Sequence, residues 1–419
     1  MAAATPWLFV TDIHLKAHSS AEKLPSPIGE DTDAALWESA VHAMQRVDPN
    51  PPVVVVTGDL LAHVISRRDT TPTAVAIAQR LGRAFPHAQF VLALGNEDSA
   101  CGDYALAPDA QFLRAVAAAW GPLVNRRGAA PGFMHTFVHD GFYTVRLPVA
   151  GLHAIVVDDV YWSPRYHAAC GQAGNVVNDS FTELESALHA LPGPVWVLFH
   201  IPPGIDAFST ALISKRTVLV PFMRPDLRDR LTADLAGKHI ALAVAAHTHK
   251  FAYRIVDASG PNPVPMLLVP ALSPIFGNEP AFLTADVTSG GALRHVEVTS
   301  FKQGRWSDIG GMRSLGVDAF TGKALVDLQA RLAANPALRP TFERLYNAGA
   351  PSEINERNWP IYWCAATAFG TTPFRTCTRA GGFSIITQRG LEAVAGVLLF
   401  VLVAVIAIDR RRRRRRLGP

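Results

Sequence analysis

The chain has 419 residues, more than one small hydrophobic core needs, so we expect a large domain with a smaller appendage. Hydrophobic residues make up 49% of the chain and charged residues 18%, which excludes an intrinsically disordered protein. The formal net charge is +4, but removing the seven arginines at 410–416 leaves −3. The body of the protein is therefore mildly acidic, and its charge gives no case for nucleic-acid binding.

Short apolar runs alternate with helical stretches over the first two-thirds of the chain. The runs do not alternate with polar residues, which is typical of strands buried on both faces. We expect strands at Trp7–Val10, Val53–Val56, Phe90–Leu94, His153–Val157, Val195–Phe199 and Ile240–Ala245. We expect helices at Ala34–Val47, Thr73–Phe85, Pro108–Trp120 and Thr182–Leu191. Asp31, Thr32 and Asp33 offer N-caps to the first helix, and the alternation as a whole predicts an α/β fold.

Beyond residue 252 the pattern changes. Strand-like pieces follow one another at Met266–Val269, Phe282–Val287 and Leu293–Val298, without helices between them. Looser helical segments follow at Ala324–Ala334 and Arg339–Asn347. We therefore expect a first domain over residues 5–300 and a small, mainly helical C-terminal region over residues 301–385.

The end of the chain predicts a membrane anchor. Ala393–Ile408 is uncharged and almost wholly apolar, and as a helix it would span ~24 Å at ~1.5 Å per residue, slightly short of a ~30 Å hydrocarbon core. Including Leu391 and a snorkelling Glu392, we expect a transmembrane helix over residues 391–408 and an Arg-rich tail over 409–419. The alternative is a buried core helix, which seven consecutive arginines disfavour.

Polar side chains follow five of the expected strands. In open α/β sheets, ligands bind beyond the carboxyl ends of the strands. The candidates, in chain order, are Asp12, His14, Asp59, Asn96, His200, His247 and His249. Such a mixed nitrogen and oxygen set suits Zn, Mn or Fe rather than Mg or Ca. With a bridging carboxylate, seven ligands suffice for two divalent metal ions, a centre suited to attack on a phosphoester.

No single motif carries this inference, because Gly-Asp pairs are common and a lone histidine at a strand end is more often structural. The order of the five motifs is more specific. Asp-x-His, Gly-Asp, Gly-Asn-x-Asp, His and His-x-His resemble the calcineurin-like metallophosphoesterase superfamily. The sequences at 200–206 (HIPPGID), 96–104 (NEDSACGDY) and 273–278 (SPIFGN) are similar to the acid sphingomyelinase-like branch, which includes polyphosphatase-like members. The resemblance covers roughly residues 7–300.

The resemblance implies a four-layer αββα sandwich and phosphoester hydrolysis by a metal-bound hydroxide. It also implies how the ligands divide. Asp59 would bridge two metals, the first held with Asp12, His14 and His249, the second with Asn96, His200 and His247. The candidate catalytic residues are Asn96, Glu97 and His200. Glu97 would act as proton donor or substrate contact.

Two positions depart from the family pattern. Glu97 stands where a histidine is usual after Gly-Asn, and a carboxyl group can donate a proton only if its pKa is raised. Ala246 stands where glycine is usual before His-x-His, a harmless change unless the backbone there needs a positive φ.

Compartment and cysteine state are linked. A span followed by cytoplasmic arginines would place the catalytic domain outside the cytoplasm, although no signal peptide is visible at the N-terminus. The alternative is a tail-anchored protein with a cytoplasmic catalytic domain. The four cysteines allow three pairings, and Cys364 and Cys377 could close a short loop, but buried free thiols fit the sequence equally well.

The leading hypothesis is a membrane-anchored, metal-dependent phosphodiesterase or phosphatase acting on a phosphoester substrate. Its alternative is a degenerate, non-catalytic phosphate-binding or interaction protein on the same fold, a role that Glu97 favours and seven filled ligand positions oppose. Lipids, nucleotides and polyphosphate are the candidate substrate classes.

Overall fold

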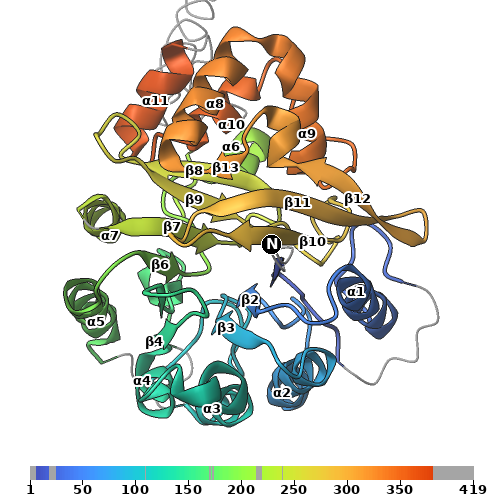
Figure 1. Cartoon of the computed structure of the whole chain (residues 1–419), viewed down its shortest axis with the longest axis vertical. Helices are drawn as coiled ribbons and strands as arrows, with labels where there is room; N and C mark the ends of the chain where they lie inside the picture. The colour runs from blue at the N-terminus through green and yellow to red at the C-terminus, as the bar shows by residue number, and fades with distance from the viewer. Residues whose placement is uncertain are drawn as a thin grey trace, which may run out of the picture.

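A computed structural model describes residues 6–17, 25–108, 110–168, 171, 174–213, 219–237 and 239–380. Within these residues the fold is mixed α/β, with two sheets and helices around them (Figure 1). The two sheets pack against each other through large aromatic side chains. Trp7 and Phe9 of the first sheet contact Trp196 of the second, with Trp7 and Trp196 ring centroids 5.1 Å apart.

The first sheet has the order β12-β11-β10-β1-β2-β3, with β13 paired to β11. β1, β2 and β3 are parallel, and β10 joins them antiparallel to β1. The bounds of its strands are β1 Trp7–Val10, β2 Val53–Thr57, β3 Gln89–Ala93, β10 Ala281–Val287, β11 Leu293–Lys302, β12 Arg305–Gly311 and β13 Ala319–Phe320.

The second sheet has the order β4-β5-β6-β7-β9-β8. β5, β6, β7 and β9 are parallel, and the antiparallel strands β4 and β8 stand at its edges. The bounds of its strands are β4 Tyr143–Arg146, β5 His153–Val156, β6 Val195–Leu198, β7 Ile240–Ala245, β8 Ala252–Val256 and β9 Val264–Leu268.

Helices surround the sheets on both sides (Figure 1). The helices of the first two-thirds are α1 Ala34–Val47, α2 Arg67–Ala84, α3 Gln111–Val124, α4 Phe133–Asp140, α5 Val176–Ala190, α6 Ala207–Ile213 and α7 Pro225–Ala236. The C-terminal helices, orange to red in Figure 1, are α8 Gly322–Ala334, α9 Arg339–Tyr346, α10 Trp359–Ala365 and α11 Thr371–Ala380. They gather at one end of the molecule, where α8 packs on β8 and β9.

The predicted α/β fold is confirmed. All six strands expected in the first two-thirds are present, and each deviates by no more than one residue at either end. α1 begins and ends where predicted, and Asp33 caps it by accepting a 2.7 Å hydrogen bond from the backbone N–H of Leu36. α2 begins six residues earlier than expected, because packing of its buried face continues past Pro72.

The expected boundary at residue 300 falls inside a strand. β11 continues to Lys302 and pairs with β12 of the supposed C-terminal region, with Thr299 opposite Asp308. The hydrogen-bonded sheet therefore extends past the predicted boundary, because a two-residue turn at Gln303 and Gly304 folds the chain straight back. The division of the chain into domains otherwise stays a prediction.

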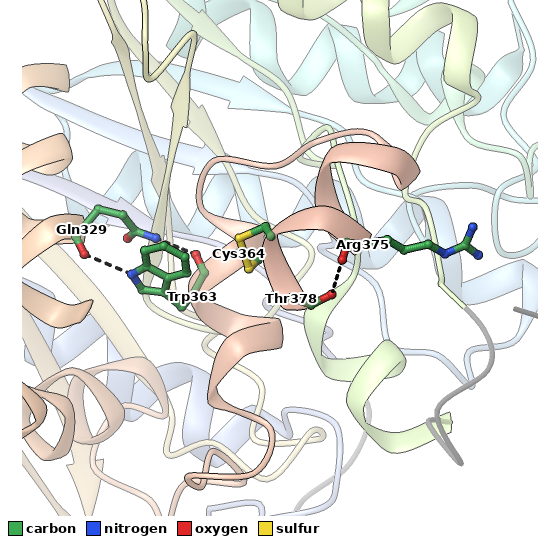
Figure 2. Close-up of a disulfide and its surroundings, with 6 residues drawn as sticks. Gln329, Trp363, Cys364, Arg375 and Thr378 are labelled. Carbon is green, nitrogen blue, oxygen red and sulfur yellow. Dashed lines mark hydrogen bonds between the residues drawn. A yellow bond between two sulfur atoms is a disulfide. The ribbon is translucent and has the colours of Figure 1, made fainter. Parts of the chain in front are cut away.

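A disulfide joins two of the C-terminal helices. Cys364 on α10 and Cys377 on α11 are bonded, with their Cα atoms 5.8 Å apart (Figure 2). The neighbouring Trp363 binds Gln329 of α8 through two hydrogen bonds, from its indole N–H at 3.0 Å and to its carbonyl at 2.6 Å. No described cysteine is a free thiol, so the alternative of free thiols is wrong for this pair.

The predicted transmembrane helix at 391–408 and the tail at 409–419 lie outside the described residues. Among the helices that are described, none combines the length and the apolar character needed to cross a bilayer.

Candidate metal centre

The seven predicted ligands lie at the carboxyl ends of parallel strands. Asp12 and His14 follow β1, Asp59 follows β2, Asn96 follows β3, His200 follows β6, and His247 and His249 follow β7. Because the two sheets pack face to face, these ends meet at one place, and the structure brings together side chains up to 237 positions apart in sequence.

The ligands form two adjoining groups. In one, atoms of Asp12, His14 and His249 lie within 4.8 Å of one another; in the other, atoms of Asp59, His200 and His247 do. Asp59 connects the groups, since its Oδ2 lies 3.4 Å from His14 Nε2 and 3.2 Å from His200 Nε2. This is the position that a carboxylate shared by two cations must occupy.

Backbone carbonyls set the tautomers of two of the histidines. His14 Nδ1 lies 3.0 Å from the carbonyl of Leu61, and His200 Nδ1 lies 2.7 Å from that of Thr57. A carbonyl only accepts, so each neutral ring carries its proton on Nδ1 and turns the Nε2 lone pair inward. This arrangement is usual for metal-binding histidines.

Several buried polar atoms at the centre fit a cation. Both carboxylate oxygens of Asp12, Oδ1 of Asn96 and Nε2 of His200 are buried and have no hydrogen-bond partner among the described residues. Buried polar groups are nearly always satisfied. The amide of Asn96 is oriented by its Nδ2, which donates to Asp103 Oδ1 at 2.8 Å and leaves the oxygen free to bind a cation. The residues present therefore fit divalent metal ions.

Two further buried carboxylates order the ligand-bearing loops. Asp98 accepts backbone hydrogen bonds of 2.8 Å from Leu60 and Gly95, so it ties the segment after β2 to the segment after β3. Asp159 accepts hydrogen bonds from the backbone N–H groups of His200 and Ile201. Neither carboxylate belongs to the ligand groups, and both hold the ligands in place through the backbone of their loops.

Glycines allow the loops to approach closely. A Cβ on Gly95 would lie 2.2 Å from Asp59 Oδ1, and one on Gly58 would lie 2.6 Å from the nitrogen of Gly95. Gly58 also adopts a φ of +99°, which favours glycine. Ala246, by contrast, does not have a positive φ, so this departure from the family pattern leaves the backbone unstrained.

Burial and neighbouring charge shift the pKa values of the ligands. Burial lowers the pKa of His247 to about 3 and that of His14 to about 4, so both rings are neutral at neutral pH, the form that binds metal ions. Burial raises the pKa of Asp12 to about 8. Although burial alone would lower the pKa of His200, the charge of Asp59 raises it to about 10, so a cation binding there displaces a proton.

A cavity of ≈ 270 Å³ opens onto the ligands. Asp59, Asn96, His247 and His249 lie in its wall together with Glu97. The backbone N–H of Glu97 donates to Asp59 Oδ1 at 2.8 Å, which fixes the bridging carboxylate. Burial, and then the charge of Asp59, raises the pKa of Glu97 to about 9. This environment meets the condition for proton donation, although a cation beside Asp59 would lower that pKa.

Three of the cavity residues that were not predicted from the sequence bear on its chemistry. His63 stacks on His14 with ring centroids 4.4 Å apart, and its Nδ1 lies 2.9 Å from Asp31 Oδ1. Phe276 packs edge-on against His249, and its side chain remains partly exposed. His63 follows β2 by the same rule that found Asp59, so its placement was a usable signal.

Arg165 is the third of these residues and gave no signal in the sequence. Its guanidinium binds Asp103 Oδ2 at 2.9 Å and lies 4.3 Å from the ring centre of Tyr104. The Tyr104 hydroxyl in turn lies 3.3 Å from His247 Nε2. Arg165 therefore supplies a positive charge at the mouth of a cavity lined by carboxylates.

No protein-family model matches the chain. It is 26% identical over 277 residues to sphingomyelinase phosphodiesterase D of Dictyostelium discoideum, an alignment that covers 61% of this chain and 56% of the relative. It is 24% identical over 302 residues to acid sphingomyelinase-like phosphodiesterase 3b of Mus musculus, covering 63% of this chain and 61% of the relative. These matches confirm the resemblance inferred from the motifs.

The chain thus spans less than two-thirds of the length of either relative. Among solved structures, a dimetal phosphatase from Danio rerio is similar to 73% of this chain and 99% of its own, with a TM-score of 0.44 and 10% sequence identity.

Proposed function

Because this chain is a relative of the acid sphingomyelinase-like phosphodiesterases, we propose that it is a metal-dependent phosphoester hydrolase, acting as a phosphodiesterase or a phosphatase. On this proposal its two sheets and their helices form the four-layer αββα sandwich of the calcineurin-like metallophosphoesterases. One observation carries the proposal: Asp59 lies within 3.4 Å of His14 and within 3.2 Å of His200, between two groups of ligands.

The ligand groups define what each residue would hold. One metal would be bound by Asp12, His14 and His249. The other would be bound by Asn96, His200 and His247, and Asp59 would bind both metals. Bound by these residues, two divalent ions would supply charge neutralisation for a phosphate and a lowered pKa for water at neutral pH. The carbonyl of Leu61 keeps the inward Nε2 of His14 unprotonated, and the carbonyl of Thr57 orients the inward Nε2 of His200, from which a cation would displace a proton.

We expect residues beside the ligands to transfer a proton to the leaving group. Glu97 faces the cavity from the loop after β3, and His63 faces it from the loop after β2 with its outer nitrogen held by Asp31. Both are within the cavity wall, and both are backed by carboxylates that favour their protonated forms. We assign leaving-group protonation to this pair, with Glu97 taking the position where the family usually has histidine.

Arg165 would hold the anionic substrate. It is a cation in a wall that otherwise carries Asp59, Glu97 and Asp103, and it is preorganised by its bond to Asp103. A planar guanidinium pairs with phosphate oxygens through two parallel hydrogen bonds. It therefore offsets the repulsion that the charge of Asp59 would exert on a phosphate.

Turnover of bis-p-nitrophenyl phosphate by metal-loaded protein tests the function. We expect hydrolysis with Mn or Zn, a loss of at least about 100-fold in Asp59→Asn, and no loss in Asp327→Asn. Asp327 is the matched control, since it is an exposed carboxylate that pairs with Arg331 on α8 and with no other described residue. Fully loaded wild-type protein that hydrolyses no substrate in a broad panel of phosphoesters would contradict the proposal and favour the non-catalytic alternative.

We further propose that residues 391–408 anchor the protein in a membrane, with the Arg tail cytoplasmic and the catalytic domain outside. The apolar run, the arginines that follow it and the Cys364–Cys377 disulfide support this orientation, because disulfides persist in oxidising compartments. Protease treatment of sealed vesicles whose non-cytoplasmic face is outside tests it, and we expect the catalytic domain to be digested and the tail to be protected. Digestion of the tail with protection of the catalytic domain would contradict this orientation.

A further inference from the structure

A second, larger cavity lies at the opposite edge of the sheets from the metal centre. It has a volume of ≈ 450 Å³ and is bounded by the turn between β4 and β5 and by the segment between α3 and α4. Pro52, Gln89 and His153 line it, and they stand at the starts of β2, β3 and β5. The cavity thus opens at the amino ends of the strands, and it shares no lining residue with the metal centre.

Among the described residues, three arginines face this cavity and no carboxylate does. Arg126, Arg127 and Arg146 are in its wall, as are His87 and His153. None of the three arginines forms an ion pair with a described residue. Positive charge is gathered here although the body of the chain is mildly acidic, so average composition does not account for it.

Hydrogen bonds to the backbone hold two of these side chains without neutralising them. Arg126 donates from Nη1 to the carbonyl of Pro86, and Arg146 donates from Nη2 to that of Gly128 at 2.9 Å. Burial and the neighbouring charge of Arg127 lower the pKa of Arg126, which shows that the positive charge is crowded. The arrangement fixes the cations in place and leaves their mutual repulsion uncompensated.

Two buried polar atoms of the lining residues lack partners. Nε of Arg126 and Nδ1 of His153 are both buried and form no hydrogen bond with a described residue. An unsatisfied buried donor such as the Nε–H of Arg126 is rare in folded proteins and costs free energy. An anion in the cavity would offer Arg126 an acceptor and neutralise the arginines at the same time.

We propose that this cavity binds a multivalent, phosphate-bearing anion through Arg126, Arg127 and Arg146. Guanidinium groups match phosphate oxygens in shape and charge, and the cavity is of the size usual for small-molecule sites. Apolar side chains such as Leu147 and Val149 complete the wall, so the ligand can carry an apolar part. A soluble polyphosphate and the headgroup of an anionic lipid share this chemistry.

Arginine footprinting of the full chain tests the proposal residue by residue. Phenylglyoxal modifies exposed arginines, and peptide mapping reports each position apart from the Arg tail. We expect inorganic tripolyphosphate, or vesicles of equimolar phosphatidylcholine and phosphatidylserine, to protect Arg127 and Arg146 but not the exposed control residues Arg83 and Arg305. Protection by vesicles alone identifies a lipid headgroup, and protection by tripolyphosphate alone identifies a soluble anion. No protection by either probe would overturn the proposal.

A matched pair of double variants provides the second measurement. Arg127→Glu/Arg146→Glu and Arg83→Glu/Arg305→Glu change the net charge equally and leave the Arg tail intact. We expect the first pair to weaken binding of the protecting probe by about tenfold or more and the second to leave it nearly unchanged. Equal effects of the two pairs would mean that bulk charge, not the cavity, binds the anion. Turnover at the metal centre should be unchanged in both, which separates this proposal from the proposed function.

Discussion

Five of the seven ligand side chains are attached to residues in the left-handed region of backbone conformation. Asp12 and His14 have a φ of 44°, Asp59 of 52°, His249 of 59° and His247 of 64°. A non-glycine residue there costs of order 1–3 kcal/mol, and such residues persist only where their surroundings determine the conformation. Here the surroundings are backbone hydrogen bonds between the loops, such as that from the N–H of His14 to the carbonyl of Asp59 at 3.0 Å. The loops alone therefore hold the predicted ligands in place.

Glu97 is the residue whose role is most sharply testable. If it donates a proton to the leaving group, Glu97→Gln should lower kcat by about 100-fold or more for an alkyl phosphodiester, whose leaving group needs the proton. The same variant should change kcat little for bis-p-nitrophenyl phosphate, because nitrophenolate leaves without protonation. Steady-state kinetics on both substrates would measure the difference.

An equal loss on the two substrates would show instead that Glu97 only positions Asp59 or the substrate. The variant Glu97→His tests the remaining possibility, that the protein is not catalytic. If wild-type protein is inactive and this variant is active, the natural chain is a degenerate phosphate-binding protein.

Gly95 should tolerate no side chain. Its Cβ would overlap Asp59 Oδ1 at 2.2 Å, so Gly95→Ala must displace the bridging carboxylate or the loop after β3. We expect a destabilisation of about 1–3 kcal/mol and a loss of metal. Gly290→Ala is the control, since a Cβ there would meet nothing closer than 4.0 Å. Denaturant unfolding and metal analysis measure both effects, and retention of full metal content by Gly95→Ala would contradict this geometry.

Much of the site could be predicted because its ligands share one rule, a polar side chain directly after a buried strand. The rule gives positions and not contacts. It could not show that Asp98 and Asp159 orient the ligand-bearing loops. In a sequence, a carboxylate that accepts hydrogen bonds from backbone N–H groups cannot be told from any other carboxylate. Arg165 reaches the cavity from the loop after η2 (Val160–Trp162), far from any strand end, and only the folded chain reveals it.

At the scale of elements, the strands with unbroken apolar sequences could be predicted most directly. β1, β2 and β7 are almost completely buried and appear in the sequence as unbroken apolar runs. β12 was missed because it is largely exposed and contains Ser307, Asp308 and two glycines, and only its pairing with β11 makes it a strand. The two-residue turn before it also explains why the expected domain boundary at residue 300 falls inside the sheet.

The disulfide between α10 and α11 should stabilise the C-terminal helices and have no effect on turnover at the metal centre. It closes a loop with a sequence separation of 13, for which loss of a cross-link costs about 3 kcal/mol. We expect Cys364→Ala/Cys377→Ala to unfold at lower denaturant concentration with unchanged turnover per folded molecule, because neither helix contributes to the wall of the metal cavity. A loss of turnover in the folded double variant would show that α10 and α11 do shape the site.

At the scale of the whole molecule, the two edges of the sheets gather different ionisable side chains. The carboxyl ends gather Asp12, Asp59, Glu97 and Asp98 around the ligand histidines, whereas the amino ends gather three arginines around the second cavity. The sequence shows neither cluster as a run, because each is assembled from segments that only the sheet order brings together. The parallel strands common to both sheets create this polarity, since all their carboxyl ends point the same way.

The metal content of the purified protein is the most direct test of the central claim, that Asp59 joins two groups of ligands into one centre. Elemental analysis after saturation with Zn or Mn and removal of free metal should give two ions per chain in the wild type and in Asp327→Asn. Asp59→Asn, which keeps the size of the side chain and removes its charge, should lose metal. A wild type that retains no more than one ion at saturation, or an Asp59→Asn variant that retains both, would contradict the account.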